Sequence, residues 1–245
     1  MFREDQETES IDVDECSAEK SAPLFVVATP IGNMEDITLR ALRILEESDL
    51  IVCEDTRVAK KLLFRHGISK PLLAVPQRAS EEKFTRILDA LRGGKRVSLI
   101  TDAGTPGISD PGNEVVERTI RAGYEVSPVP GPSALAAILS VAGIDTSEFC
   151  FKGFPPHKKG RETFFRAVSD SLVPVVYYDS PYRVIKNLEL LSTLSPERNI
   201  VLGRELTKVF EEVLRGNVVH VLEYYEKHPE KVKGEFVLMV FRGKS

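Results

Sequence analysis

The chain is poor in residues that build metal centres and disulfide frameworks, with three cysteines and four histidines in 245 residues. Cys16, Cys53 and Cys150 are widely spaced and form no Cys-x-x-Cys pair, and the histidines show no ligand spacing. These patterns disfavour a zinc site and a secreted, disulfide-stapled domain. We therefore expect no metal and a reduced compartment, the cytoplasm.

Long apolar runs are also missing. The most apolar stretch, residues 134–144, is shorter than the roughly 18 residues that a membrane span needs. The first residues lack the basic start and apolar centre of a signal peptide. We expect no membrane partner. A hydrophobic content of 42% and this length suit two modest domains with cores of their own.

Several catalytic motifs are absent or incomplete. Residues 93–95 read Gly-Gly-Lys without the rest of a phosphate-binding loop, and no Gly-x-Ser-x-Gly elbow occurs. Acids some twenty residues after Gly32 resemble a dinucleotide-binding layout. However, residues 29–33 hold one glycine where that fingerprint needs three, and Pro30 removes an amide that would bind pyrophosphate. A dinucleotide fold is therefore disfavoured.

Negative charge is concentrated at one end. Residues 1–22 carry eight acids and two bases, Arg3 and Lys20, and so have a net charge of −6. Since the net charge of the whole chain is −4, residues 23–245 carry about +2. A nucleic-acid substrate is compatible with that remainder. We expect the segment 1–22 to be a disordered acidic tail, because it has too few apolar residues to offset its ordering.

Apolar runs at residues 24–28, 50–53, 72–75, 97–100 and 124–129 alternate with amphipathic segments. This alternation predicts an N-terminal α/β domain over 23–145 with a mostly parallel sheet. Asp36 and Thr56 are the expected caps of its first two helices.

Composition changes after residue 145. Strands are expected at 175–178, 200–203, 209–214 and 235–241, with helices near 162–167 and 182–191. Their short spacing predicts a C-terminal α/β domain over 146–245 with a mixed, partly antiparallel sheet.

The strand at 97–100 ends in a glycine- and proline-rich loop in which Asp102 is the first acid. Such loops at the carboxyl ends of parallel strands hold ligands in open α/β sheets. The alternative is a tight surface turn with Asp102 as its turn former.

Six stretches recur in the order typical of one known family: residues 29–33 (TPIGN), 54–57 (EDTR), 102–106 (DAGTP), 130–134 (PGPSA), 204–208 (RELTK) and 233–235 (KGE). In these motifs the chain resembles the ribosomal RNA small-subunit cytidine 2′-O-methyltransferases, within the tetrapyrrole methylase superfamily. The resemblance spans residues 24–241. It implies two α/β domains, a homodimer, S-adenosylmethionine bound in the cleft between the domains, and 16S rRNA of the small ribosomal subunit as substrate.

The resemblance also implies which residues bind the methyl donor. The expected cofactor-binding residues are Pro30, Asp102, Gly104, Thr105, Pro106, Ser133, Ala134, Tyr178 and Leu206. Backbone groups of glycine and proline loops suit the polar atoms of this donor, and a small side chain at Ala134 leaves room for its adenine ring.

A ribose hydroxyl is a poor nucleophile, so a general base is expected. The candidate catalytic residues are Glu54, Asp55, Arg57, Glu205 and Lys208. The acids of 54–57 also suit a plain helix start. Glu205 and Lys208 also suit an exposed ion pair.

A basic segment follows residue 151 and suggests phosphate contacts. The expected RNA-binding residues are Lys152, Lys158, Lys159, Arg161 and Arg183. A solvated basic connection is the alternative.

Two departures from the family pattern bear on the substrate. Residues 76–80 read PQRAS where the family carries a His/Asn-rich segment, and Asp179 and Tyr182 stand where Glu and His are usual. Two other functions therefore stay open: a superfamily methyltransferase acting on a tetrapyrrole or other small acceptor, and an RNA-binding module without turnover.

Overall fold

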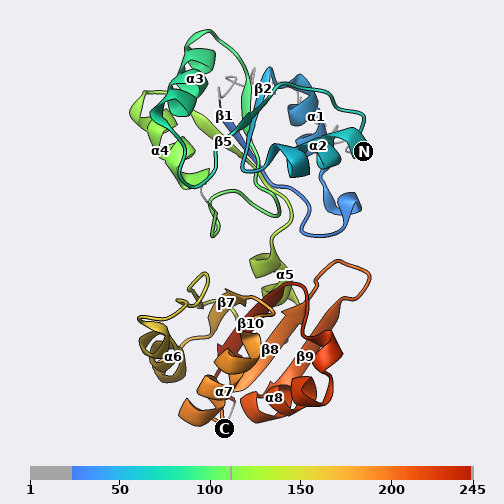
Figure 1. Ribbon diagram of the computed structural model, residues 1–245, viewed down its shortest axis with the longest axis vertical. Helices are drawn as coiled ribbons and strands as arrows, with labels where there is room; N and C mark the ends of the chain where they lie inside the picture. The colour runs from blue at the N-terminus through green and yellow to red at the C-terminus, as the bar shows by residue number, and fades with distance from the viewer. Residues whose placement is uncertain (1–23, 111, 244–245) are drawn as a thin grey trace, which may run out of the picture.

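Short apolar strands and amphipathic helices form two lobes joined at a narrow waist (Figure 1). The computed structural model describes residues 24–110 and 112–243. The expected acidic tail lies outside these residues. The N-terminal lobe contains the first five strands, and the C-terminal lobe contains the last five. None of the helices described is both long and apolar enough to cross a bilayer.

The N-terminal sheet is entirely parallel, as the alternating pattern predicts. It has the order β3-β2-β4-β1-β5. Its strands are β1 (Leu24–Val27), β2 (Leu50–Cys53), β3 (Leu72–Ala74), β4 (Val97–Leu99) and β5 (Val126–Val129). Since β1 lies between β4 and β5, the loops that follow these three strands emerge side by side at one edge of the sheet.

Two pairs of helices bury their apolar faces on opposite sides of this sheet. One side carries α1 (Leu39–Glu47) and α2 (Thr56–Arg65), whose apolar residues share a core with β1 and β2. The other side carries α3 (Glu81–Arg92) and α4 (Gly112–Arg121), which pack with β3 and β4. A short 3-10 turn, η1 (Met34–Asp36), precedes α1.

The C-terminal sheet is mixed, as predicted, and has the order β6-β7-β10-β8-β9. Only the β6–β7 pair is parallel; the other three pairs are antiparallel. The strands are β6 (Cys150–Phe151), β7 (Val175–Asp179), β8 (Asn199–Arg204), β9 (Glu212–Asn217) and β10 (Phe236–Phe241).

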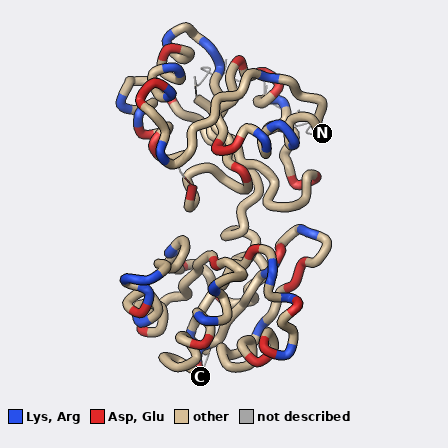
Figure 2. Tube along the Cα trace, viewed as in Figure 1, with Lys and Arg blue, Asp and Glu red and all other residues tan. Residues whose placement is uncertain are grey.

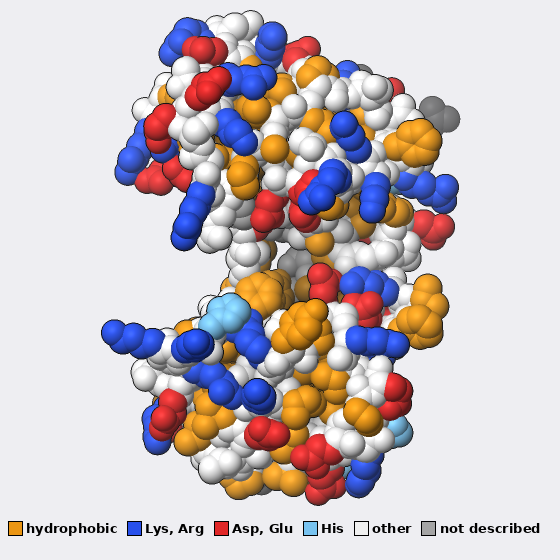
Figure 3. All heavy atoms as spheres, viewed as in Figure 1, with side chains coloured by type: hydrophobic (Ala, Val, Ile, Leu, Met, Phe, Trp, Pro, Cys, Tyr) orange, Lys and Arg blue, Asp and Glu red, His pale blue; other side chains and the backbone are white. Residues whose placement is uncertain are grey.

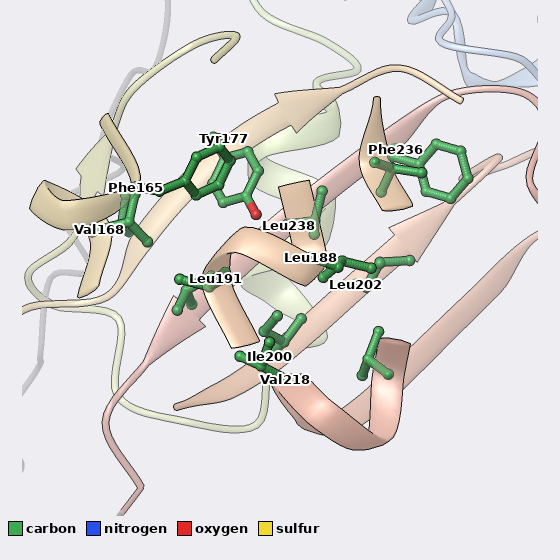
Figure 4. Packing of buried hydrophobic residues seen from close by; sticks show 14 of the residues in the cluster. Phe165, Val168, Tyr177, Leu188, Leu191, Ile200, Leu202, Val218, Phe236 and Leu238 are labelled. Carbon is green, nitrogen blue, oxygen red and sulfur yellow. The ribbon is translucent and has the colours of Figure 1, made fainter. Parts of the chain in front are cut away.

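The main core of the C-terminal lobe lies between this sheet and three helices (Figure 4). The helices are α6 (Arg161–Asp170), α7 (Val184–Leu194) and α8 (Val218–Lys227), followed by η2 (Pro229–Lys231). In Figure 4, Phe165 and Tyr177 lie against each other, and their ring centroids are 5.8 Å apart.

Helix α5 (Ala134–Ser140) covers the opposite face of the C-terminal sheet, although it directly follows the last strand of the N-terminal sheet. Its Ile138 is fully buried with Val176 and Val201. The polypeptide therefore crosses the waist before α5 begins.

Both expected helix caps were wrong by one or two residues. Thr38 caps α1 and accepts a hydrogen bond from the Ala41 amide at 3.0 Å, while Asp36 ends η1. Asp55, not Thr56, caps α2, and its carboxylate accepts from the Arg57 amide at 2.8 Å. In both helices the capping side chain is the one whose backbone is still extended.

The region after residue 208 also differs from the prediction. The strand expected at 209–214 begins three residues later, as β9, and α8 follows it immediately. Helix α8 was missed because Val218, Val219 and Val221 have strand-like side chains. Its start is fixed by Asn217, whose side chain accepts from the His220 amide at 2.8 Å.

The buried position of Leu202 in β8, 0% exposed, predicts a strong dependence of stability on its side chain. Leu202→Ala should lower the free energy of unfolding by about 2–5 kcal/mol, because it leaves a cavity among α7, α8 and β10. Leu172→Ala, at a site 79% exposed, should change it by less than about 0.5 kcal/mol. Urea denaturation of both variants measures the difference, and equal effects would contradict the packing described.

Candidate active site

Three loops at the carboxyl edge of the N-terminal sheet are bonded to one another. The Thr29 amide donates to the Gly104 carbonyl at 2.9 Å, and the Gly104 amide donates back at 3.1 Å. The hydroxyl of Thr105 donates to the Pro132 carbonyl at 3.1 Å. Gly104 has a φ of 85°, and a Cβ there would lie 3.3 Å from Ile31 Cγ2, so this close approach favours glycine.

These loops form one wall of a cavity of about 420 Å³ between the lobes. Figure 3 shows the surface hollowed at the waist. The C-terminal lobe supplies the other wall, from the ends of β7, β8 and β10. Seven of the nine residues predicted to bind the methyl donor line this cavity, which is named the donor cavity after that prediction: Asp102, Gly104, Thr105, Ser133, Ala134, Tyr178 and Leu206.

The other two predicted cofactor-binding residues lie elsewhere. Pro30 lines a second cavity of about 260 Å³, and Pro106 is buried and lines neither cavity. The two cavities are adjacent and share a wall made of Ile31, Thr101, Asp102, Ala103 and Glu235.

The donor cavity is acidic. Its lining residues that the structure describes include no Lys, Arg or His and five acids: Glu54, Asp102, Asp110, Asp179 and Glu235. The cavity also has an apolar side that the sequence did not single out, with Ile31, Ile108, Phe154 and Val237. Phe154 packs edge-on against Tyr178, with ring centroids 5.5 Å apart.

Most of these acids are engaged by the protein. Asp110 accepts from the Gly107 and Gly112 amides at 2.9 and 2.7 Å. The carboxylate of Asp179, 3% exposed, accepts from Asn187 Nδ2 at 2.7 Å. The sequence analysis noted Asp179 only because the family usually has Glu at this position. Nothing in the sequence predicted that Asp179 lines the cavity.

Glu54 is different, because its carboxylate has no hydrogen-bond or ion-pair partner among residues 24–110 and 112–243. Partial burial, followed by the nearby charges of Asp102, Asp110 and Asp55, raises the pKa of the Glu54 carboxyl. Partial burial likewise raises the pKa of Asp102, although its carboxylate accepts a 3.2 Å hydrogen bond from the Asp55 amide. Both carboxyls therefore lie beside the cavity with their charge poorly compensated.

Asp55, which is half-buried, and Arg57, which is exposed, form an ion pair that lines neither cavity. The Arg57 guanidinium donates to Asp55 Oδ2 at 2.6 Å. Hydrogen bonds from the side chain and the amide of Arg57 lower the pKa of the Asp55 carboxyl to about 2. A carboxylate with so low a pKa is a weak proton acceptor.

Glu205 and Lys208 connect three of the motifs. Lys208 Nζ donates to Glu205 Oε1 at 2.6 Å and to Glu235 Oε2 at 2.9 Å. The Glu205 carboxylate also accepts from the Glu235 amide at 3.0 Å. Burial alone would raise the pKa of Glu205, but Lys208 and the Glu235 amide outweigh it and lower that pKa.

Two glycines make room for this cluster. A Cβ at Gly32, in the N-terminal lobe, would lie 2.3 Å from Lys208 Cγ. A Cβ at Gly234, where φ is 85°, would lie 2.3 Å from the Glu205 carboxyl carbon. The Lys208 side chain therefore crosses Gly32 and ties the first loop of the N-terminal lobe to the C-terminal sheet. Lys208 lines the second cavity, whereas Glu205 lines neither.

The basic segment predicted to contact RNA lies on the C-terminal lobe, outside both cavities. Arg161 donates to Asn187 Oδ1 at 2.7 Å, and Arg183 donates to the Pro155 carbonyl at 2.8 Å. The Lys152 ammonium lies 6.0 Å from the centre of the Phe164 ring. Lys158 and Lys159 are exposed. Arg161 and Arg183 therefore hold the segment in place, and Lys158 and Lys159 present its charge to solvent.

The described residues contain no group of three or more His, Cys, Asp or Glu side chains placed to hold a metal ion.

Sequence relatives resemble the chain over most of its length. A protein of Thermotoga maritima named ribosomal RNA small subunit methyltransferase I is 42% identical over 221 residues, covering 90% of this chain and 98% of the relative. A protein of Leptospira biflexa with the same name is also 42% identical, covering 89% of this chain and 90% of the relative.

Solved structures share the fold at lower identity. A cobalt precorrin-4 methyltransferase matches with a TM-score of 0.65 at 19% identity, covering 88% of this chain and 93% of that chain. A uroporphyrin-III-C-methyltransferase from Thermus thermophilus matches with a TM-score of 0.63 at 20% identity, covering 90% and 94%. These likenesses confirm the predicted two-lobed architecture.

The family model described as tetrapyrrole (corrin/porphyrin) methylases matches residues 23–221. With this match and relatives more than 40% identical over about nine-tenths of its length, the chain belongs to the tetrapyrrole methylase family.

Proposed function

We propose that this protein is an S-adenosylmethionine-dependent methyltransferase that modifies the ribose 2′-hydroxyl of a cytidine in 16S rRNA. The observation that carries the proposal is the acidic cavity between the lobes, built from the motif loops after β1, β4 and β5. The names of the relatives support ribosomal RNA as the substrate. The cytoplasm, where ribosomal subunits are made, is the proposed compartment, and a homodimer is the proposed assembly.

The residues of the donor cavity fit this cofactor. S-adenosylmethionine supplies an activated methyl group on a positively charged sulfonium. Glu54 and Asp102 offer carboxylates whose charge has no cationic neighbour in the cavity lining that the structure describes. Such groups favour a positively charged ligand in a partly desolvated site. Ile31, Ile108 and the Phe154 ring provide apolar surface for the adenine ring.

Among the candidate bases, Glu54 suits the proton transfer best. It lines the donor cavity, its carboxylate has no hydrogen-bond partner among the described residues, and its pKa is raised toward the pH at which a base works efficiently. Asp55 and Glu205 both have lowered pKa values and line neither cavity. We therefore assign Glu54 as the general base and Asp55 with Arg57 as the cap that fixes the start of α2.

Glu205 and Lys208 are assigned as positioning residues. Their cluster holds the Gly32 loop, one side of the second cavity, against the C-terminal sheet. Alignment of donor and acceptor supplies up to roughly 7–11 kcal/mol of a barrier reduction in favourable cases. A rigid connection between the two lobes serves that alignment.

A small tetrapyrrole acceptor is the second candidate, because the fold neighbours are named for that chemistry. Those neighbours are 19–20% identical to the chain, whereas the relatives named for ribosomal RNA are 42% identical. The exposed cations Lys158 and Lys159 also favour a polyanion.

The first prediction about function concerns the donor. The purified protein should bind S-adenosylmethionine by calorimetry, and Asp102→Ala should weaken binding about tenfold or more because it removes a carboxylate from the cavity wall. Asp49→Ala is the control, because Asp49 precedes β2, accepts from the Arg96 amide at 2.8 Å and lines neither cavity. Ribosomal RNA from cells lacking the protein should lack one 2′-O-methylcytidine in its 16S component. An unchanged methylation map would contradict the proposed function.

The second prediction concerns the base. Glu54→Gln should lower turnover about 10²–10⁴-fold without abolishing donor binding. In the wild type, kcat/KM should fall as the pH drops through the raised pKa of Glu54, because protonation removes the base; the glutamine variant should lose this dependence. Asp55→Asn should keep the wild-type profile, since a pKa of about 2 leaves Asp55 ionised throughout. A wild-type rate and profile in Glu54→Gln would exclude Glu54.

The third prediction concerns the connection between the lobes. Gly32→Ala should displace the Lys208 side chain and lower kcat/KM about tenfold. Adding Lys208→Ala removes the clash, so the double variant should be no worse than Lys208→Ala alone. Gly93→Ala, where a Cβ would lie 3.4 Å from its nearest neighbour, is the control. Purely additive effects in this double-mutant cycle would show that the two residues act independently.

A further inference from the structure

Helix α2 presents an exposed face that the proposed catalytic machinery does not use. Its apolar residues Ala59, Leu62 and Leu63 are buried in the N-terminal core. Residues at spacings of three and four positions share a helix face, and on α2 this spacing places Lys60, Lys61, Phe64 and Arg65 together on the outer side. These four residues, all exposed, are called the α2 face.

The cations of the α2 face have no acidic partner among the described residues. Arg57, one turn earlier, is paired with Asp55, but within residues 24–110 and 112–243 no ion pair involves Lys60, Lys61 or Arg65. Helix α2 itself contains no Asp or Glu. Figure 2 shows Lys and Arg positions along α2 with no acidic position between them.

Other helices of the same lobe carry balanced charge. On α3, Arg92 pairs with Asp89 at 2.6 Å, and on α4, Arg121 pairs with Glu117 at 2.7 Å. The net positive charge of the α2 face is therefore a local feature and not a general property of this lobe. A polyanion is the ligand that such a face would attract.

An aromatic ring lies within this positive face. Phe64 is 87% exposed, so its ring buries little apolar surface in the described structure. Exposed aromatic rings flanked by cations are the arrangement by which proteins stack unpaired bases while holding the phosphates beside them. A base in a duplex is stacked on its neighbours, so this arrangement favours a single-stranded segment or a loop.

The α2 face continues into the second cavity. Val58, Lys61 and Leu62 line that cavity from α2, and Lys208 lines it from the C-terminal lobe. Asp102 and Ile31 separate it from the donor cavity. A nucleotide in the second cavity would thus lie between Lys61 and Lys208, with Asp102 and Glu235 on the side shared with the donor cavity. Its ribose must point toward that side to reach Glu54 and the methyl group.

We propose that the α2 face and the second cavity together bind a single-stranded segment of the RNA substrate. Lys60, Lys61 and Arg65 hold its phosphates, Phe64 stacks one base, and the nucleotide to be methylated enters the second cavity. Taking that nucleotide out of its stack gives the enzyme access to its ribose, as in other enzymes that act on single nucleotides. This assignment rests on the proposed function, and it adds a binding surface on the lobe opposite Lys158 and Lys159.

The test compares two triple variants of the full-length protein. In the α2 variant, Lys60→Gln, Lys61→Gln and Arg65→Gln remove three charges from the face. In the control, Arg86→Gln, Arg92→Gln and Lys95→Gln remove three exposed charges from α3 and the turn after it. Binding to 16S rRNA and to small ribosomal subunits from cells lacking the protein is measured over a range of salt concentrations, and donor binding is measured by calorimetry.

The α2 variant should bind RNA at least tenfold more weakly than the control at low salt. Its slope of log affinity against log salt should be smaller by about 2, from three lost contacts to single-stranded phosphates. Phe64→Ala should weaken binding about tenfold and leave the salt slope unchanged, because stacking is not ionic. Donor binding should match the wild type in all variants.

The outcomes separate this proposal from the proposed function. If the wild type methylates the RNA and the α2 variant binds and methylates it as well as the control does, the α2 face is not the RNA surface and the function stands. If the wild type neither binds nor methylates the RNA, both are wrong. If Phe64→Ala leaves RNA affinity unchanged while the α2 variant loses affinity as expected, the stacking role is wrong and the phosphate contacts stand.

Discussion

The two hydrogen bonds between Thr29 and Gly104 are the contact on which the candidate site depends. They join the loops after β1 and β4, strands that are neighbours in the sheet but lie some seventy residues apart in the sequence. The Thr29 hydroxyl adds a bond to the Thr101 carbonyl at 3.1 Å. Because these bonds involve mainly backbone groups, they fix the backbone positions of Ile31 and Asp102 independently of the conformations of the two side chains. Both cavities share those two residues.

Much of the architecture could be predicted because each element carries its own local signal. Apolar runs alternating with amphipathic segments predicted all five strands of the parallel sheet, and close spacing predicted the mixed sheet. The failures arose where two local signals compete. Thr38 and Asp55 each lie within two residues of another good capping residue, and only the backbone angles decide between them. The valines of α8 favour a strand, but packing against α7 and the sheet stabilises a helix.

The candidate site was predictable as a set of loops, whereas its chemistry was not. The family resemblance identified seven residues that line the donor cavity. It could not show that Asp55 is held by Arg57 while its neighbour Glu54 has no such partner, because that depends on which side chain faces the cavity. Nor could spacing reveal that Lys208 crosses Gly32, a contact between residues 176 positions apart. Long-range contacts of this kind exist only once both lobes are folded.

The distribution of charge separates two ligands of opposite sign. A cationic donor is favoured by the carboxylates of Glu54 and Asp102, and the same carboxylates repel an RNA phosphate from the donor cavity. The cations of the α2 face, together with Lys158 and Lys159, lie outside the donor cavity and have no ion-pair partner among the residues that the structure describes. A polyanion drawn to these surfaces can therefore reach the donor only through an uncharged part of a nucleotide. A ribose hydroxyl is such a part, and it is the group that the proposed reaction methylates.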